Sequence, residues 1–352
     1  MVKIDLITGF LGSGKTTFIR GYARNLMSKG EKICIIENDY GAVNIDMVML
    51  QDLLEEGCNL EMIIGGDGQE AHRRRFRTKL ISMGMSGYDR VIIEPSGIYD
   101  IDEFFDALYD EPLDKWYEIG SVISLVDAQA VHDLDGLERY VFMSEIANAG
   151  KLVYTKLAES GIPAGQSVSN TITIPETALT SGAPANAETV TTTVNDIMAE
   201  FGVKTFDAEK DIIAKPFSEY TKEDYESLEN CGYRHASYTK LSIEDKQFTP
   251  LFYFDVEMPE KKLREIAGSL FDNERAGHVI RIKGFVKVSE GGKTDEVISE
   301  CESGQVQINA TEKEISIVPY SSSRNVLIII GERLNKEYIN DRMRDYCSVV
   351  SL

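Results

Sequence analysis

Short runs of apolar residues alternate with amphipathic stretches over the first half of the chain. The apolar runs cover residues 4–7, 33–37, 91–94 and 122–126, with 152–154 as a further candidate, and a polar or glycine-containing turn follows each. After the first run, apolar residues recur at helical spacing until Gly30: Phe18, Ile19, Tyr22, Ala23, Leu26 and Met27. Strands that alternate with helices are typical of a mostly parallel α/β sheet.

A different pattern begins at about residue 241. An apolar run at 251–256 precedes a helical stripe of Leu263, Ile266, Ala267, Leu270 and Phe271. Further strands are predicted near residues 280–288, 306–310, 315–318 and 326–330, with a closing helix from about residue 335. Residues 280–288 alternate apolar with basic positions, which predicts one solvated face. The pattern indicates a smaller α+β domain.

The stretch between these two patterns differs in composition. Residues 160–188 are rich in Ser, Thr, Gly, Ala and Pro and carry only two acidic residues and no basic one, which predicts a mobile surface loop. A length of 352 residues suits about two domains. We therefore predict one domain over residues 1–240 and a second over residues 241–352.

Charge and cysteine usage limit the class of partner. Acidic residues outnumber basic ones, 58 to 37, and the formal net charge of -21 argues against nucleic acid or an anionic membrane as the main partner. The five cysteines are scattered without a C-x-x-C pair, as is typical of reduced thiols. Met1 leads directly into the first apolar run and no apolar stretch could span a bilayer, so we expect a cytoplasmic protein without a signal peptide.

The strongest chemical motif follows the first apolar run. Residues 9–17 read GFLGSGKTT, which satisfies G-x-x-x-x-G-K-[ST] between a predicted strand and a predicted helix, and this context defines a nucleotide-binding P-loop. Its glycines let backbone N–H groups surround a polyphosphate, and the following helix adds its positive end. The predicted nucleotide contacts are Gly12, Ser13, Gly14, Lys15, Thr16 and Thr17. Lys15 is expected to reach the β- and γ-phosphates, and the Thr16 hydroxyl to bind Mg²⁺.

Two acidic segments accompany the P-loop. Residues 91–97 form an apolar strand that ends in Glu94 and continues to Gly97, as in a Walker B element. Glu94 would hold the Mg²⁺ shell or orient the attacking water, and Gly97 would offer its N–H to the γ-phosphate. Residues 37–42, with Glu37 and Asp39, follow the second apolar run, where a metal-coupled switch would lie. Glu94 as a solvated strand-end charge is the alternative.

These motifs resemble the CobW-type branch of the P-loop GTPases, which is related to the hydrogenase and urease nickel-insertion factors. The resemblance rests on residues 7–17, 37–41, 94–97 and 126–128, and in the second half on residues 281–285 and 329–332. It implies an α/β P-loop NTPase domain followed by a CobW C-terminal-like α+β domain. It further implies a low-turnover GTPase that uses Mg²⁺ and delivers Zn²⁺ or Co²⁺ to a client metalloprotein.

The chain departs from that family in two places. Where relatives carry a C-x-C-C motif, residues 65–72 read GGDGQEAH, so any metal would be held by harder ligands, with Glu37, Asp39, Asp67 and His72 as candidates. A solvated turn is the alternative. Where guanine-specific sites read N-K-x-D, residues 155–158 read TKLA, so only Lys156 matches and the choice between GTP and ATP stays open.

Other features leave alternatives open. Asp127, after the fourth apolar run, is either a site residue or a helix cap. The basic run at residues 72–77 is either a solvated helix face or a patch for an acidic client or the phosphates. A nucleotide-dependent scaffold or regulator without metal transfer is the alternative function, and a small-molecule kinase would need an acceptor-binding base that the sequence does not reveal. A homo-oligomer stays open.

Overall fold

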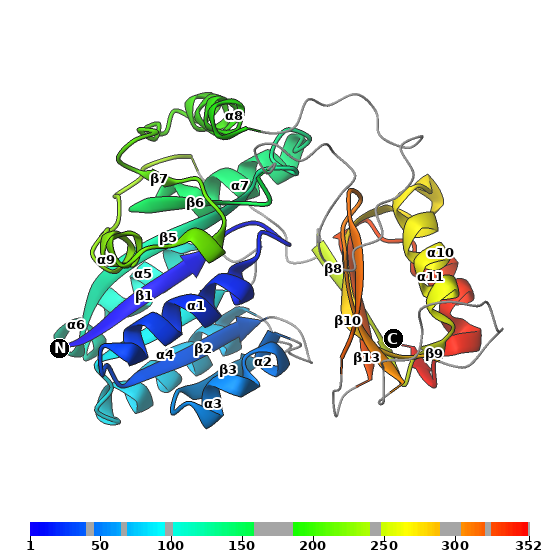
Figure 1. The fold of residues 1–352 in the computed structure, drawn as a ribbon, viewed down its shortest axis with the longest axis horizontal. Helices are drawn as coiled ribbons and strands as arrows, with labels where there is room; N and C mark the ends of the chain where they lie inside the picture. Colours follow the sequence, from blue (N-terminus) through cyan, green and yellow to red (C-terminus); the bar gives the residue numbers. More distant parts are fainter. Residues whose placement is uncertain are drawn as a thin grey trace. The chain divides into compact units, whose positions relative to one another are not determined.

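The computed structural model describes residues 1–39, 46–64, 69–95, 101–157, 186–239, 248–288, 304–320 and 325–350. Contacts divide the chain into two compact units (Figure 1): the first comprises Met1–Ser160 and Ala183–Lys240, and the described part of the second lies within Leu241–Leu352. The predicted boundary at residue 240 and most of the predicted loop at 160–188 lie outside the described residues. None of the described helices is long and apolar enough to cross a membrane.

The first unit is built on a seven-stranded sheet in which every pair of neighbouring strands is parallel. The strand order is β3-β2-β4-β1-β5-β6-β7, so β1 lies at the centre. The strands are β1 (Val2–Thr8), β2 (Ile33–Asp39), β3 (Asn59–Ile64), β4 (Arg90–Pro95), β5 (Tyr117–Asp127), β6 (Lys151–Thr155) and β7 (Ile212–Ile213). The predicted parallel α/β sheet is confirmed, and β3 and β7 are additions to it.

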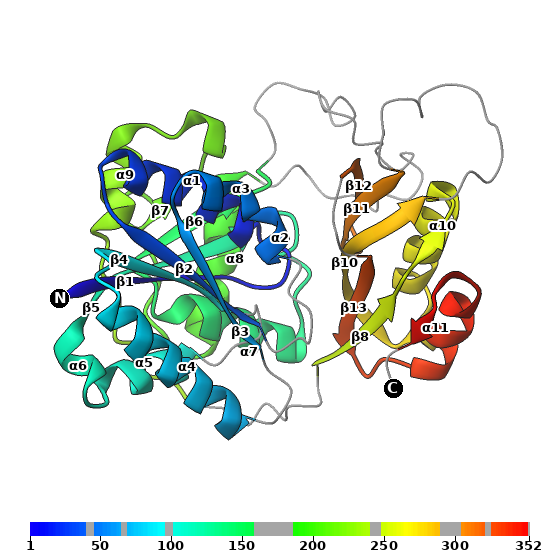
Figure 2. The same cartoon turned by 90° about the horizontal axis from the view of Figure 1, so that it is seen from below.

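Helices cover both faces of this sheet, as Figure 2 shows for α1 on one side and α4, α5 and α6 on the other. The helices are α1 (Lys15–Ser28), α2 (Asp46–Met49), α3 (Gln51–Glu55), α4 (Gln69–Met85), α5 (Ile101–Tyr109), α6 (Leu113–Trp116), α7 (Gly136–Ala147), α8 (Ala187–Glu200) and α9 (Lys222–Glu229). The apolar stripe of α1 packs with Ile35 and Ile92, whereas α4 and α5 pack with Ile36 and Ile93. Successive residues of a strand therefore face different helices.

The second unit is a mainly antiparallel sheet of order β12-β11-β10-β13-β8-β14, with β9 pairing parallel to β10. Its elements are β8 (Phe248–Phe254), β9 (Glu257–Met258), α10 (Glu260–Phe271), β10 (His278–Val288), β11 (Gln305–Ala310), β12 (Ile315–Pro319), β13 (Val326–Glu332), α11 (Lys336–Met343) and β14 (Val349–Val350). This agrees with the predicted α+β pattern.

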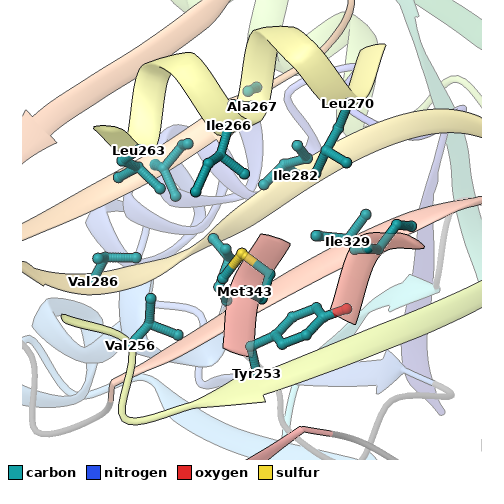
Figure 3. Packing of buried hydrophobic residues seen from close by; sticks show 14 of the residues in the cluster. Tyr253, Val256, Leu263, Ile266, Ala267, Leu270, Ile282, Val286, Ile329 and Met343 are labelled. Carbon is teal, nitrogen blue, oxygen red and sulfur yellow. The ribbon is translucent and has the colours of Figure 1, made fainter. Parts of the chain in front are cut away.

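One hydrophobic core lies between the helices and the sheet of the second unit. Leu263, Ile266 and Leu270 project from α10 onto β10 and β13, where Ile282 and Ile329 meet them (Figure 3). Met343 of α11 joins the same cluster. The helical spacing of the α10 stripe thus corresponds to the buried side of that helix, because residues three and four apart share one face.

Candidate nucleotide site

The loop between β1 and α1 has the backbone that a P-loop requires. Gly9, Gly12 and Gly14 have φ values of 136°, 82° and 91°, which side chains other than glycine rarely adopt. A Cβ atom on Gly9 would lie 2.4 Å from the carbonyl oxygen of Leu125, so this position also needs glycine for space. The loop ends at the N-terminus of α1, where unpaired N–H groups favour an anion.

Lys15 lies against this loop. Its ammonium donates a hydrogen bond to the carbonyl oxygen of Gly9 at 2.7 Å, and the residue is only 7% exposed. The buried hydroxyl of Ser13 has no hydrogen-bond partner among the described residues, whereas Thr17 is exposed on the first turn of α1. A lysine ammonium next to a loop of inward-facing backbone N–H groups is the arrangement that binds a polyphosphate.

Oxygen-bearing side chains of α1, β4 and β2 are connected by one hydrogen bond and by the register of the two strands. The Thr16 hydroxyl donates to a carboxylate oxygen of Glu94 at 3.1 Å. Glu37 and Glu94 are register partners on the neighbouring strands β2 and β4, so both project to the face that α1 covers. All three side chains are buried. Two buried carboxylates and a hydroxyl are hard oxygen ligands of the kind that Mg²⁺ prefers.

The other predicted metal ligands do not join this group in the described part of the chain. His72 is buried in the first turns of α4, the helix that packs on the opposite face of the sheet from α1. Asp39 ends β2, but its side chain is not described, and Asp67 and Gly97 lie outside the described residues. Within those residues, no three His, Cys, Asp or Glu side chains form a group able to hold a metal ion.

The side expected to receive the base carries an ion pair. Lys156, with φ of 54°, approaches a carboxylate oxygen of Asp127 at 2.7 Å. The other Asp127 oxygen accepts from the backbone N–H groups of Gln129 and Ala130, so Asp127 caps the turn after β5 rather than an α-helix. The Thr155 hydroxyl lies within hydrogen-bonding distance of the carbonyl oxygens of Ser13, at 2.9 Å, and Val126. The segment with Lys156 is therefore tied to the P-loop; Ala158 lies outside the described residues.

A buried charged cluster that the sequence analysis missed lies within the central strands. Asp5 of β1 accepts hydrogen bonds from Arg90 at 2.6 Å, from the Tyr22 hydroxyl at 2.8 Å and from the Ser121 N–H at 2.9 Å. Arg90 also donates to Glu31 at 2.9 Å. The sequence does indicate such a cluster, because a charged residue inside an apolar strand, such as Asp5, must find a buried partner.

The basic run on α4 is mostly an intramolecular feature. Arg73 and Arg77, one turn apart, face Asp106 of α5 and Asp110, which directly follows α5, at 3.8 Å and 2.7 Å. Both pairs are largely exposed, so each contributes little to stability. Arg74 remains exposed on the same helix. These contacts favour the interpretation of a solvated helix face for at least half of the run.

This loop, lysine, hydroxyl and strand-end carboxylate on a parallel sheet define a P-loop nucleotide-binding domain. Residues 3–168, which include the P-loop, Glu37 and Glu94, match the CobW/HypB/UreG nucleotide-binding domain.

Curated relatives agree with this assignment. The chain is 27% identical over 168 residues to the zinc chaperone YjiA of Escherichia coli, covering 46% of this chain and 51% of the relative. It is 29% identical over 157 residues to the zinc chaperone YeiR of the same species, covering 44% and 47%. The chain thus spans about half the length of the curated relatives it matches. The crystal structure of Zn(II)-bound YjiA GTPase from E. coli covers 98% of both chains with 16% identity and a TM-score of 0.35.

Proposed function

We propose that this chain is a GTPase switch that binds zinc as cargo and delivers it to a client metalloprotein. Three observations support the proposal. Residues 3–168 match the CobW/HypB/UreG nucleotide-binding domain, Lys15 and Thr16 contact the Gly9 carbonyl and Glu94 at the P-loop, and matched relatives are zinc chaperones. The matches cover about half of each relative. The client protein, the zinc cargo and the rate of hydrolysis are therefore proposed for this chain.

Nucleotide binding would begin with an exchange of partners at Lys15. The ammonium leaves the Gly9 carbonyl for a β- or γ-phosphate oxygen, a charge-assisted contact stronger than the one it replaces. The α1 N-terminus and the loop N–H groups, with Ser13 and Thr17 nearby, hold the remaining phosphate oxygens. Gly97 stays a predicted γ-phosphate contact, and Lys156 a predicted contact of the base.

Hydrolysis would use the buried oxygen cluster. Thr16, Glu94 and Glu37 would hold Mg²⁺, which neutralises phosphate charge when it is bound there. Glu94 would in addition accept a hydrogen bond from the attacking water or orient it, and Lys15 would stabilise charge that develops on the transferred phosphoryl group. No described residue is assigned as an arginine finger. Low turnover, as in other switch GTPases, is part of the proposal.

The contact between Thr16 and Glu94 carries this proposal, because it joins the P-loop helix to the strand-end carboxylate. The test is GTP binding and phosphate release by the purified full chain with Mg²⁺, with Thr17→Ser as a control that keeps the exposed hydroxyl. We expect saturable binding, slow release of phosphate, and loss of release in Thr16→Ala. A wild-type chain that binds neither GTP nor ATP would contradict the proposal.

A scaffold without metal transfer is the second candidate, and two observations favour it. The sequence has no cysteine between Cys58 and Cys231, and the described residues contain no metal-holding group. Zinc held by oxygen and nitrogen ligands alone, with Asp39, Asp67 and His72 as the remaining candidates, would bind more weakly than at a thiolate site. Titration of wild type and His72→Ala with Zn²⁺ or Co²⁺, with Mg²⁺ and GTP present, separates the candidates, because the scaffold predicts no binding by either protein.

A further inference from the structure

A buried carboxylate lies beside the first glycine of the P-loop. Glu145 belongs to α7 and is 0% exposed. Its Oε2 atom accepts a hydrogen bond from the backbone N–H of Gly9 at 3.3 Å. The cost of burying a carboxylate is large, so its retention beside the first glycine of the loop calls for a reason.

The backbone of the same residue fastens α7 to the central strands. The carbonyl oxygen of Glu145 lies within hydrogen-bonding distance of the hydroxyls of Thr8, at 2.7 Å, and Ser124, at 3.0 Å, which also contact each other. Thr8 ends β1 immediately before Gly9, and Ser124 is its register partner on β5. These contacts therefore hold the Glu145 backbone against the strands, and its side chain reaches the next residue of the loop.

Gly9 joins Glu145 to Lys15. Its N–H donates to the Glu145 carboxylate, while its carbonyl oxygen accepts from the Lys15 ammonium. The Gly9 N–H is therefore already bonded to Glu145, and the orientation of Gly9 determines where its carbonyl oxygen holds Lys15. Gly9 has a φ of 136°, and because glycine has no Cβ it could adopt other orientations unless a partner fixes this one.

We propose that Glu145 is a positioning residue: its carboxylate accepts the Gly9 N–H, which fixes the orientation of Gly9 and thereby presets the loop and Lys15 for the polyphosphate. This inference rests on the proposed nucleotide-binding function and adds to it a buried residue outside the motif. Glu145 would act through the position of its acceptor oxygen rather than through its charge. Glutamine, which keeps an acceptor oxygen at the same reach, should therefore replace Glu145, and aspartate, which is shorter by one methylene, should not.

The experiment compares Glu145→Ala, Glu145→Gln and Glu145→Asp with wild type in the full chain. Readouts are the Kd for a non-hydrolysable GTP analogue with Mg²⁺, kcat for GTP hydrolysis, and the thermal unfolding midpoint. Ser144→Ala is the matched control, because the Ser144 hydroxyl is buried on the same helix but bonds to the α7 carbonyl of Val141.

We expect Glu145→Ala and Glu145→Asp to weaken analogue binding about tenfold and to lower kcat further, while Glu145→Gln stays within about threefold of wild type. Ser144→Ala should match wild type. If Glu145→Ala fails to fold, the aspartate and glutamine variants decide. Wild-type affinity in a folded aspartate or alanine variant, or equal loss in the glutamine and alanine variants, overturns the inference alone. A wild-type chain that binds no nucleotide overturns the proposed function and this inference together.

Discussion

Removal of Arg90 tests how the central strands are held together. Arg90 is 3% exposed at its side chain and Asp5 is fully buried, and the two meet at 2.6 Å. They join β1, which leads into the P-loop, to β4, which ends with Glu94 and Pro95, and the Ser121 N–H adds β5. Arg90→Met keeps much of the apolar volume but leaves the Asp5 carboxylate buried without its cation.

The expected loss in the free energy of unfolding depends on the hydrogen bonds that Asp5 keeps in Arg90→Met. Loss of one partner from a buried ion pair costs about 3–5 kcal/mol. Asp5 keeps its hydrogen bonds from Tyr22 and Ser121, so we expect the lower end, about 3 kcal/mol. Arg77→Met is the control, because Arg77 and Asp110 form an exposed pair at 2.7 Å that should cost about 1 kcal/mol or less.

The same variant predicts a pH dependence of stability. Burial raises the pKa of Asp5, and Arg90 opposes that rise, so Arg90→Met raises the pKa further. A pKa that is higher in the folded than in the unfolded state means that the folded protein binds more protons between the two values. The free energy of unfolding therefore increases as pH falls through that window, and the deficit of Arg90→Met relative to wild type should shrink on acidification.

Urea unfolding followed by tryptophan fluorescence measures this effect. Trp116 is the only tryptophan of the chain and packs against the core of the first unit, so its emission reports that unit. The double variant Asp5→Asn/Arg90→Met should recover part of the loss, because it removes the unpaired charge. A loss below about 1 kcal/mol for Arg90→Met, or a deficit that does not change with pH, would refute the reasoning.

Further predictions concern the nucleotide. Lys15→Ala should weaken GTP binding at least about tenfold, because it removes a charge-assisted phosphate contact worth about 1.5–3 kcal/mol; unchanged affinity in the folded variant, measured by titration calorimetry, would remove Lys15 from the site. Glu94→Gln should lower kcat about a hundredfold with a smaller change in GTP affinity, since it weakens the acceptor for the attacking water; phosphate release at the wild-type rate would exclude that role. Selectivity for GTP over ATP should be well below the about 10⁴-fold that a hydrogen-bonding site can reach, because Ala158 replaces the aspartate expected after Lys156. Competition by ATP against a fluorescent GTP analogue checks this, and strong discrimination would mean that other groups read the base.

The apolar pattern predicted the central strands and α1 because these elements are buried and their periodicity is strong. The edge strand β3 was missed: its sequence, NLEMII, has polar residues at positions 59 and 61, and β2 is its one neighbour among the described strands. The strand at the opposite edge, β7, was also missed, because two residues, Ile212–Ile213, are too few to form a recognisable pattern. Helix α8 contains several threonines, which are poor helix formers, and its start is fixed by the Asn186 side chain accepting from the Thr189 N–H.

In the candidate site, residues of a contiguous motif were predicted from the sequence, whereas residues brought there by packing were not. Lys15 and Thr16 were predicted from a contiguous motif, and the register of β2 and β4 brought Glu37 beside Glu94. Glu145 was missed because it lies far along the chain and reaches the loop only through the packing of α7. His72 lies on α4, which packs on the opposite face of the sheet from the face to which Glu37 projects. A local motif could not predict this, because it depends on which face each helix covers.

The most direct test of the account is the zinc affinity of the full chain in two nucleotide states. Equilibrium dialysis with excess Mg²⁺ gives the Kd for Zn²⁺ with a non-hydrolysable GTP analogue and with GDP. A GTP-driven metallochaperone predicts saturable zinc binding whose Kd differs about tenfold or more between the two states, a coupling of about 1.4 kcal/mol. Equal affinities in the two states, or no zinc binding in either, would contradict it.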